Sequence, residues 1–150
     1  MADFAHFLPQ HVLRDRFRMV TALEDRTDEI VGFAYGFAST SDQFFYQEVA
    51  KVTHSDFVMA WFSDYFRLVQ IAVLPQVQGR GIGSALHDHL LSGLPQAKGI
   101  LATIAAETNA FQLYRQRGWQ VLLQEIFFPG VNRPYQIMGK ELVPPELAVS

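Results

Sequence analysis

Three glycines alternate with other residues in the stretch Gln78-Gly79-Arg80-Gly81-Ile82-Gly83. Glycine permits positive backbone φ and lets a ligand approach the main chain closely. Ile82, Leu86 and Leu90 follow at a spacing of four, which predicts an amphipathic helix over residues 82–91. The first N–H groups of such a helix, its dipole and the charge of Arg80 favour phosphate. The stretch therefore predicts an anion-binding loop, and a tight turn without a ligand is the competing interpretation.

Two better-known phosphate loops do not fit this stretch. A Walker loop requires Gly-Lys-Ser/Thr, whereas the chain has Gly83-Ser84-Ala85. A dinucleotide fingerprint requires a third glycine three residues after the second, and that position is Ser84. A nucleotide-binding module of either kind is thus disfavoured.

Two segments together resemble the GCN5-related N-acetyltransferases, the GNAT family. Gln78-x-x-Gly81-x-Gly83 resembles the family's Gln/Arg-x-x-Gly-x-Gly/Ala signature. Downstream, Leu113-Tyr114-Arg115-Gln116-Arg117-Gly118-Trp119 resembles Leu-Tyr-x-x-x-Gly-Phe, with Trp in place of Phe. The two motifs stand in the family's order and at its usual separation, and the resemblance covers roughly residues 30–142.

This resemblance implies an acetyl-CoA-dependent N-acetyltransferase in which the amine attacks the thioester directly. The N–H groups of residues 79–84 would hold the pyrophosphate, the strand at residues 71–73 would pair with the pantetheine, and Tyr114 would be the general acid. The family's asparagine stands seven residues before this tyrosine, where the chain has Glu107, so Asn109 is the remaining candidate for that contact. The expected cofactor-binding residues are Ile71, Ala72, Val73, Gln78, Gly79, Arg80, Gly81, Ile82, Gly83, Ser84 and Asn109.

The general base and the acceptor stay open at this stage. Gln70 occupies a place where the family often has a carboxylate, and an amide takes no proton at neutral pH. The alternatives for the base are Glu48, His54, Asp64 and Glu107. The aromatic insert at residues 42–66 either walls the amine pocket, with the loop at residues 128–135, or is a packed lid. The acceptor is a small amine, an aminoglycoside-like compound, an amino acid or a peptide N-terminus.

The surrounding pattern predicts the elements that must position these residues. A helix is expected at Phe4–Arg14, a strand hairpin at Phe17–Leu23 and Ile30–Ala38, and one or two helices at residues 42–66. A buried strand at Arg67–Leu74, the helix at residues 82–91, a strand at Ile100–Ala105, a helix at Asn109–Arg117 and strands at Trp119–Phe128 and Tyr135–Leu142 complete the order. The fold class is α+β, close to α/β: a mixed twisted sheet, parallel in the centre and antiparallel at its ends, with helices on both faces.

Composition sets the outer limits. A chain of 150 residues with 49% hydrophobic residues suits one domain, with residues 143–150 as a tail. The net charge of −3 supplies no basic field for nucleic acid or a membrane, and no metal site is expected from the cysteine-free sequence and its scattered histidines. Neither a signal peptide nor a membrane span is expected, and the absence of cysteine fits the cytoplasm.

The beginning of the chain departs from the GNAT pattern. Only 16 residues precede Phe17, so the family's first strand and helix are short or missing. A natural shortening, a truncated chain, or a second chain covering the exposed edge as in a homodimer would each explain this. Acetyl-CoA and an amine are the expected partners. A non-catalytic domain that binds or senses acyl-CoA is the alternative function.

Overall fold

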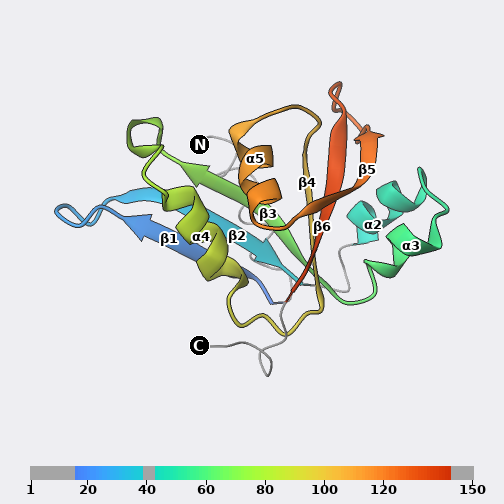
Figure 1. Cartoon of the computed structure of the whole chain (residues 1–150), viewed down its shortest axis with the longest axis horizontal. Coiled ribbons are helices and arrows are strands. Elements are labelled where there is room, and N and C mark those ends of the chain that lie inside the picture. The colour runs from blue at the N-terminus through green and yellow to red at the C-terminus, as the bar shows by residue number, and fades with distance from the viewer. Residues whose placement is uncertain (1–15, 39–42, 143–150) are drawn as a thin grey trace. The chain divides into compact units, whose positions relative to one another are not determined.

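The computed structural model describes residues 16–38 and 43–142. Their elements follow the predicted order of two strands, a helical insert, a strand, a helix, a strand, a helix and two strands (Figure 1). The predicted helix at Phe4–Arg14 and the predicted tail at residues 143–150 lie outside the described residues. The bounds are β1 Arg18–Leu23, β2 Ile30–Phe37, α2 Gln43–Ala50, α3 Asp56–Ala60, β3 Tyr65–Val73, η1 Pro75–Val77, α4 Ile82–Leu91, β4 Lys98–Ile104, α5 Asn109–Gln116, β5 Gln120–Ile126 and β6 Tyr135–Glu141.

The strands form a mixed sheet in the order β1-β2-β3-β4-β6-β5. The strands β3 and β4 are parallel, with Tyr65–Arg67 opposite Lys98–Ile100. The β1–β2, β4–β6 and β5–β6 pairs are antiparallel. The predicted sheet, parallel in its centre and antiparallel at its ends, is confirmed.

The chain divides into two compact units, each described by itself. The first comprises Met1–Ser41 and Leu68–Ser92, and the second comprises Asp42–Arg67 and Gly93–Ser150. Within the first, α4 packs against β1 and β2. The Arg18 guanidinium of β1 donates to the carbonyl oxygens of His89 and Ser92, at 3.1 and 2.8 Å, where α4 ends. A cation at this end of a helix interacts favourably with its dipole.

The second unit has helices on both faces of its strands, and the register shows why. Gly99 of β4 pairs with Lys140 of β6, and the next pair is Ile100 with Gly139. Opposing residues share a face and successive residues alternate between faces. A Cβ on Gly99 would stand 2.9 Å from the Trp119 ring, and one on Gly139 would stand 2.8 Å from the Trp61 ring. Trp119, after α5, and Trp61, after α3, therefore cover opposite faces.

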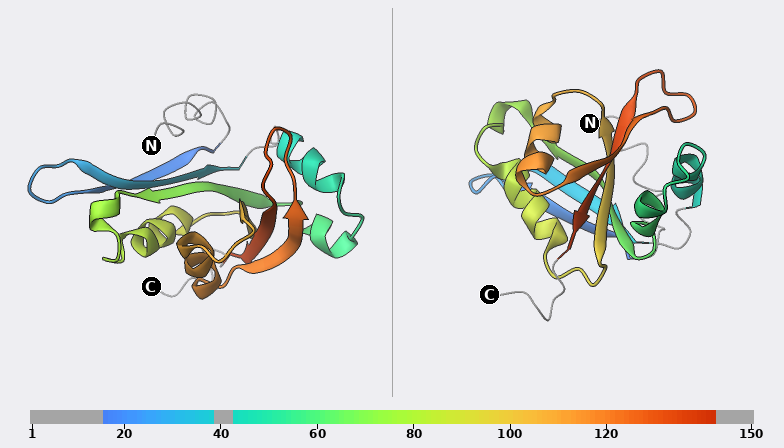
Figure 2. Two further views of the ribbon diagram at one scale, coloured as in Figure 1. Left: turned by 90° about the horizontal axis from the view of Figure 1, so that it is seen from above. Right: turned by 45° about the vertical axis from the view of Figure 1, so that its right-hand side comes forward.

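The aromatic insert packs with strand residues in a hydrophobic core cluster of this second unit. The insert contains two helices, α2 and α3, in agreement with the predicted one or two, and Figure 2 shows them as separate short helices. Phe45 of α2 stacks on Phe128 at a centroid distance of 6.0 Å and contacts Phe62 at 6.1 Å. Buried residues of the cluster are Phe45, Val49, Val58, Trp61, Phe62, Ile100, Ile126 and Ile137.

Three predicted strands need correction. The strand predicted at Ile100–Ala105 begins at Lys98, which pairs with Tyr65 and with Glu141. The strand predicted at Arg67–Leu74 begins at Tyr65, because Tyr65 and Phe66 pair with β4 rather than extending the helical insert. Most of its residues are half-buried, so the prediction of a buried strand was wrong for its second half. The strand predicted at Trp119–Phe128 is shorter and irregular, with register shifts on both sides of Leu123 and a positive φ of 55° at Glu125.

Candidate active site

The glycine loop begins where β3 leaves the sheet. The Leu74 N–H donates to the Val31 carbonyl at 2.9 Å, and Pro75 then starts the short helix η1. The Gln78 side-chain amide turns back and donates to the Val73 carbonyl at 3.1 Å. This bond connects the predicted pantetheine strand, Ile71–Val73, with the first residue of the predicted phosphate loop, so the structure brings these two groups of residues together within one unit.

Two of the three alternating glycines have the backbone geometry that only glycine adopts readily. Gly79 has φ +83° and Gly81 has φ +79°, in the left-handed region. A Cβ at either position would meet no atom within 4 Å, so the surface beside both is open. Gly83 differs, because it lies within the first turn of α4 and has no positive φ. The conformational reason for glycine therefore applies to residues 79 and 81.

Helix α4 presents its first turn at the end of this loop. Gly81 is its N-cap and supplies no side chain to accept from the helix, while the Gly81 carbonyl accepts from the Ala85 N–H at 3.1 Å. Leu86 and Leu90 are buried and hold the helix on the strands, as the spacing of four predicts. Gly79 and Arg80 are exposed. The arrangement offers main-chain donors, the positive end of a dipole and one guanidinium to an anion.

Gly32 of β2 is a supporting residue that the sequence did not reveal. A Cβ there would stand 3.0 Å from the Ala72 carbonyl oxygen and 3.1 Å from a methyl of Leu86. Because Gly32 has no Cβ, α4 and β3 can lie close to β2. A lone glycine in a strand can mark such a close approach, but that pattern alone does not say which element approaches.

Tyr114 lies on α5, on the face that packs inward. Thr108 is the N-cap of this helix and accepts from the Phe111 N–H at 3.0 Å. The Tyr114 ring is buried and contacts the Trp119 ring at a centroid distance of 6.0 Å. Burial disfavours the phenolate and raises the pKa of Tyr114 from 10.0 to about 12. The hydroxyl thus stays protonated at neutral pH and is a donor.

The remaining predicted residues of the second unit have other surroundings. Asn109, the first residue of α5, is exposed. Three base candidates already have partners: Glu48 with Lys51 at 2.8 Å, Glu107 with Arg115 at 3.1 Å, and Asp64, whose carboxylate accepts from the Ala97 N–H at 3.1 Å. His54 is exposed. The structure therefore singles out none of them as the base.

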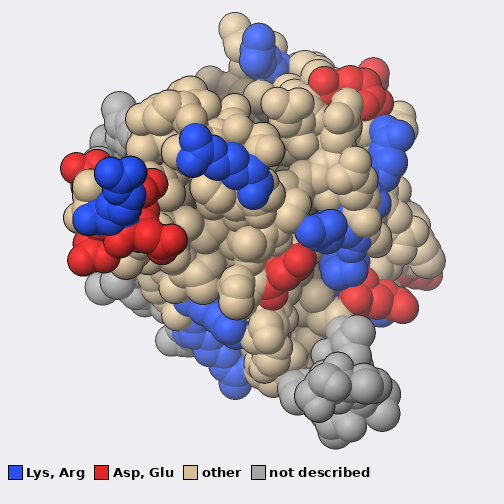
Figure 3. Space-filling model, turned by 60° about the vertical axis from the view of Figure 1, so that its left-hand side comes forward, with Lys and Arg blue, Asp and Glu red and all other residues tan. Residues whose placement is uncertain are grey.

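Charges and possible metal ligands add little to this picture. Within residues 16–38 and 43–142, no three His, Asp or Glu side chains gather in a way that would hold a metal ion. Figure 3 shows acidic and basic side chains interspersed on the face that it presents. In the same described ranges, no helix has the length and apolar character needed to cross a membrane.

Comparison with known families decides the family of this chain. The model of the acetyltransferase (GNAT) domain matches residues 15–121. The chain belongs to the GNAT acetyltransferase family. This GNAT chain is also 31% identical over 138 residues to a GCN5-like protein acetyltransferase of Mycobacterium tuberculosis, which covers 85% of the chain. It spans 66% of that relative's length.

Solved structures agree with the GNAT fold. A phosphinothricin acetyltransferase from Sinorhizobium meliloti, in complex with acetyl-CoA, superposes with a TM-score of 0.62 at 20% identity, covering 94% of this chain and 69% of that one. The ribosomal-protein-S18-alanine N-acetyltransferase from Escherichia coli gives 0.61 at 20% identity, covering 94% and 76%. At these identities the likeness establishes the fold, which confirms the resemblance predicted from the two motifs.

Proposed function

We propose that this chain moves an acetyl group from acetyl-CoA to a primary amine of a small molecule or peptide, with Tyr114 as general acid. The observation that carries the proposal is the loop from Gly79 to Gly81, whose two left-handed glycines open onto the first turn of α4. Main-chain donors of residues 79–84 bind the pyrophosphate, and the edge of Ile71–Val73 pairs with the pantetheine. Asn109 is retained as a further contact to the coenzyme.

The reaction follows from these roles. The neutral amine attacks the carbonyl carbon of the thioester, so a C–N bond forms and the C–S bond breaks. The amine nitrogen loses one proton, and the leaving thiolate of coenzyme A gains one. Tyr114 is the proposed donor toward this thiolate, because its phenol is protonated at neutral pH. Positioned acids of this kind contribute about 10²- to 10⁴-fold to a rate.

The raised pKa also limits how the tyrosine acts. A thiol ionises near pH 8.5 and the Tyr114 phenol near pH 12, so full transfer from phenol to thiolate is uphill. A hydrogen bond to the developing thiolate needs no such transfer and still stabilises charge where it forms. We propose that Tyr114 acts mainly as this hydrogen-bond donor and keeps its own proton, while the released thiolate takes its proton from solvent.

A thiol-release screen tests the proposal. Purified protein is incubated with acetyl-CoA and pools of small amines, amino acids, aminoglycosides and peptides, and free coenzyme A is followed with a thiol reagent. We expect amine-dependent release in at least one pool, with Gly81→Glu as the inactive control. Binding of acetyl-CoA without release in any pool would contradict the catalytic proposal.

One observation favours the alternative, a non-catalytic domain that binds or senses acyl-CoA. Glu48, Asp64 and Glu107 are each held by a partner within the second unit, so the structure singles out none of these carboxylates as a base for an ammonium substrate. An amine that arrives already neutral needs no base, which reconciles this observation with catalysis. A rate that rises with the neutral fraction of the amine as pH increases distinguishes the two functions, because a sensor shows no rate at any pH.

A further inference from the structure

The C-terminal end of α5 is held by a lysine from a distant strand. The Lys140 ammonium of β6 donates to the carbonyl oxygen of Arg117, the C-cap residue of α5. Its nitrogen lies 3.0 Å from the place where a Cβ on Gly118 would stand, and Gly118 has φ +91°. The last carbonyl oxygens of a helix have no partner within the helix, and they carry the negative end of its dipole. A cation at this position interacts favourably with both. Lys140 therefore closes the helix end from outside.

Tyr114 belongs to the last turn of this helix. Its carbonyl oxygen accepts from the Arg117 N–H at 3.0 Å and from the Trp119 N–H at 3.1 Å, so the backbone of Tyr114 is part of the helix end. An eight-residue helix is too short to be stable alone, and helix ends fray. The direction of the Tyr114 side chain thus depends on contacts made from outside α5.

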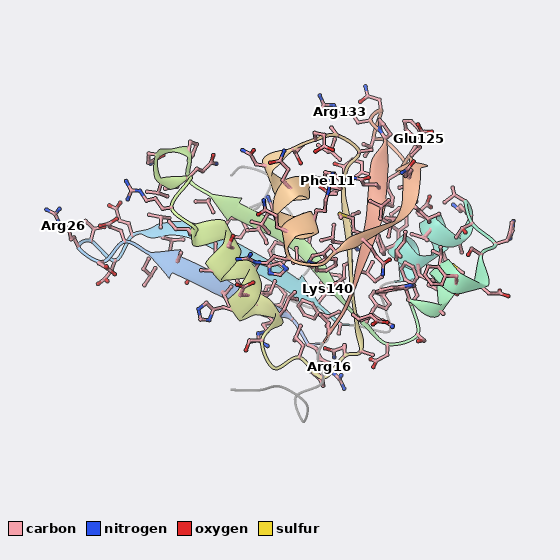
Figure 4. All side chains as sticks on the ribbon, in the orientation of Figure 1. Arg16, Arg26, Phe111, Glu125, Arg133 and Lys140 are labelled. Atoms are coloured by element: carbon pink, nitrogen blue, oxygen red, sulfur yellow. The ribbon has the colours of Figure 1, made fainter. Side chains whose placement is uncertain are left out.

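The register of β4 and β6 concentrates these contacts. Gly99 of β4 lies opposite Lys140, and a Cβ on Gly99 would stand 2.9 Å from the Trp119 ring that contacts Tyr114. In this pair of opposing residues, Gly99 leaves room for the Trp119 ring beside Tyr114, and Lys140 holds the Arg117 carbonyl, three residues after Tyr114. Figure 4 labels Lys140 on β6 and Phe111 on α5.

We infer that Lys140 is a positioning residue for Tyr114: its bond to the Arg117 carbonyl fixes the last turn of α5 and so the direction of the phenolic hydroxyl. The inference rests on the proposed role of Tyr114 as the donor to the leaving thiolate. Lys140 itself touches neither acetyl-CoA nor the acceptor in this account. Its removal should lower kcat and leave the binding of acetyl-CoA unchanged.

The first arm of the test compares lysine variants. Lys140→Met removes the ammonium, and Lys140→Arg keeps a cation with N–H donors. Lys98→Met is the matched control, because it removes the same charge one register position away. Lys98 lies on the opposite face, with its ammonium 4.7 Å from the centroid of the Trp61 ring. With the best amine of the screen, we expect Lys140→Met to lower kcat about tenfold, since misplacement by about 1 Å can cost up to about a hundredfold. The KM for acetyl-CoA should stay within about twofold.

In the same arm, Lys140→Arg should recover most of kcat, and Lys98→Met should keep kcat near that of the wild type. Thermal melting reports whether each variant is folded. Should Lys140→Met fail to fold, Lys140→Gln takes its place, with a smaller but still measurable drop expected, because its amide can donate to the Arg117 carbonyl but carries no charge.

The second arm is a double-mutant cycle with Tyr114→Phe. If Lys140 acts through the hydroxyl, Lys140→Met costs nothing further once that hydroxyl is gone. An equal fall in kcat in both backgrounds would overturn the inference while leaving Tyr114 as the donor. A Tyr114→Phe variant with unchanged kcat would instead overturn the proposed donor itself, and the two failures are thereby distinguished.

Discussion

Gly81→Ala isolates the backbone strain of the phosphate loop. Gly81 has φ +79° and ψ 9°, and a Cβ there meets no atom within 4 Å, so the substitution adds strain without a clash. Left-handed backbone costs an L-residue about 1–2 kcal/mol. The less flexible unfolded chain returns about 0.4–1 kcal/mol. The net loss is about 1 kcal/mol, which lowers Tm by about 2–4 °C in a domain of this size.

Gly83→Ala is the control, because Gly83 lies inside α4 without a positive φ. Alanine is the better helix former by up to about 1 kcal/mol, so Tm should stay level or rise. Thermal unfolding followed by circular dichroism, without ligand, measures both variants. A Gly81→Ala variant that melts at or above the wild-type temperature would show that this backbone geometry is not what the sequence requires.

The ligand arm uses a pair of variants that differ only in charge. Gly81→Glu and Gly81→Gln share size and strain, and the first also places a carboxylate at the phosphate site. Coenzyme A at 100 times its Kd stabilises the wild type by about 2.7 kcal/mol, an increase in Tm of about 5–11 °C. We expect the glutamate variant to lose this increase and the glutamine variant to keep part of it. A folded glutamate variant with the full increase would refute the loop as the phosphate site.

Three further predictions concern the second unit. Tyr114→Phe should lower kcat at least about tenfold with the KM for acetyl-CoA little changed; activity within about twofold, with chemistry limiting, would make Tyr114 a packing residue. The unfolded tyrosine ionises near pH 10 and the folded one near pH 12. Stability linked to Tyr114 is therefore complete below pH 10 and falls by up to about 3 kcal/mol as pH rises through 12; urea unfolding at pH 9 and pH 11 should show a smaller decline in Tyr114→Phe. Trp61→Ala should lower the free energy of unfolding by about 3–5 kcal/mol, because the Trp61 ring is buried against Gly139. If the insert walls the amine pocket, steady-state kinetics should also show a larger change in acceptor KM than in acetyl-CoA KM. Equal changes in the two KM values favour the packed lid.

Local periodicity predicted some elements closely. The helix at residues 82–91 has the predicted bounds, because its apolar residues recur at a helical spacing between a left-handed Gly81 and a left-handed Gly93. The segment at residues 42–66 has no such period. Its aromatic residues Phe45, Trp61 and Phe62 lie on or beside two short helices and pack into the core cluster of the second unit, whereas Tyr65 and Phe66 begin β3. The register shifts within β5, on both sides of Leu123, are likewise not visible in the local sequence pattern.

The candidate site divides in the same way. The glycine loop and the start of its helix at Ile82 were predictable because their geometry is encoded by adjacent residues. Gly32 and Lys140 were not predictable, since each depends on a partner far along the chain: Leu86 for the first and the Arg117 carbonyl for the second. Single-sequence patterns carry no information about such pairings.

The two tryptophans that press on Gly99 and Gly139 from opposite faces have a consequence for changes in chain length. Each ring fills the room left by a missing side chain, so β4 and β6 fit together in one alignment only. Loss of a single codon within β6 would exchange its faces, turning the Lys140 side chain toward Trp61 and a glycine toward α5. The tip of the turn that precedes β6, at Gly130, carries no such constraint, because a Cβ there would meet no atom within 4 Å, whereas Phe128 in the same turn stacks on Phe45. A change of length is therefore tolerated better at this tip than within the strands.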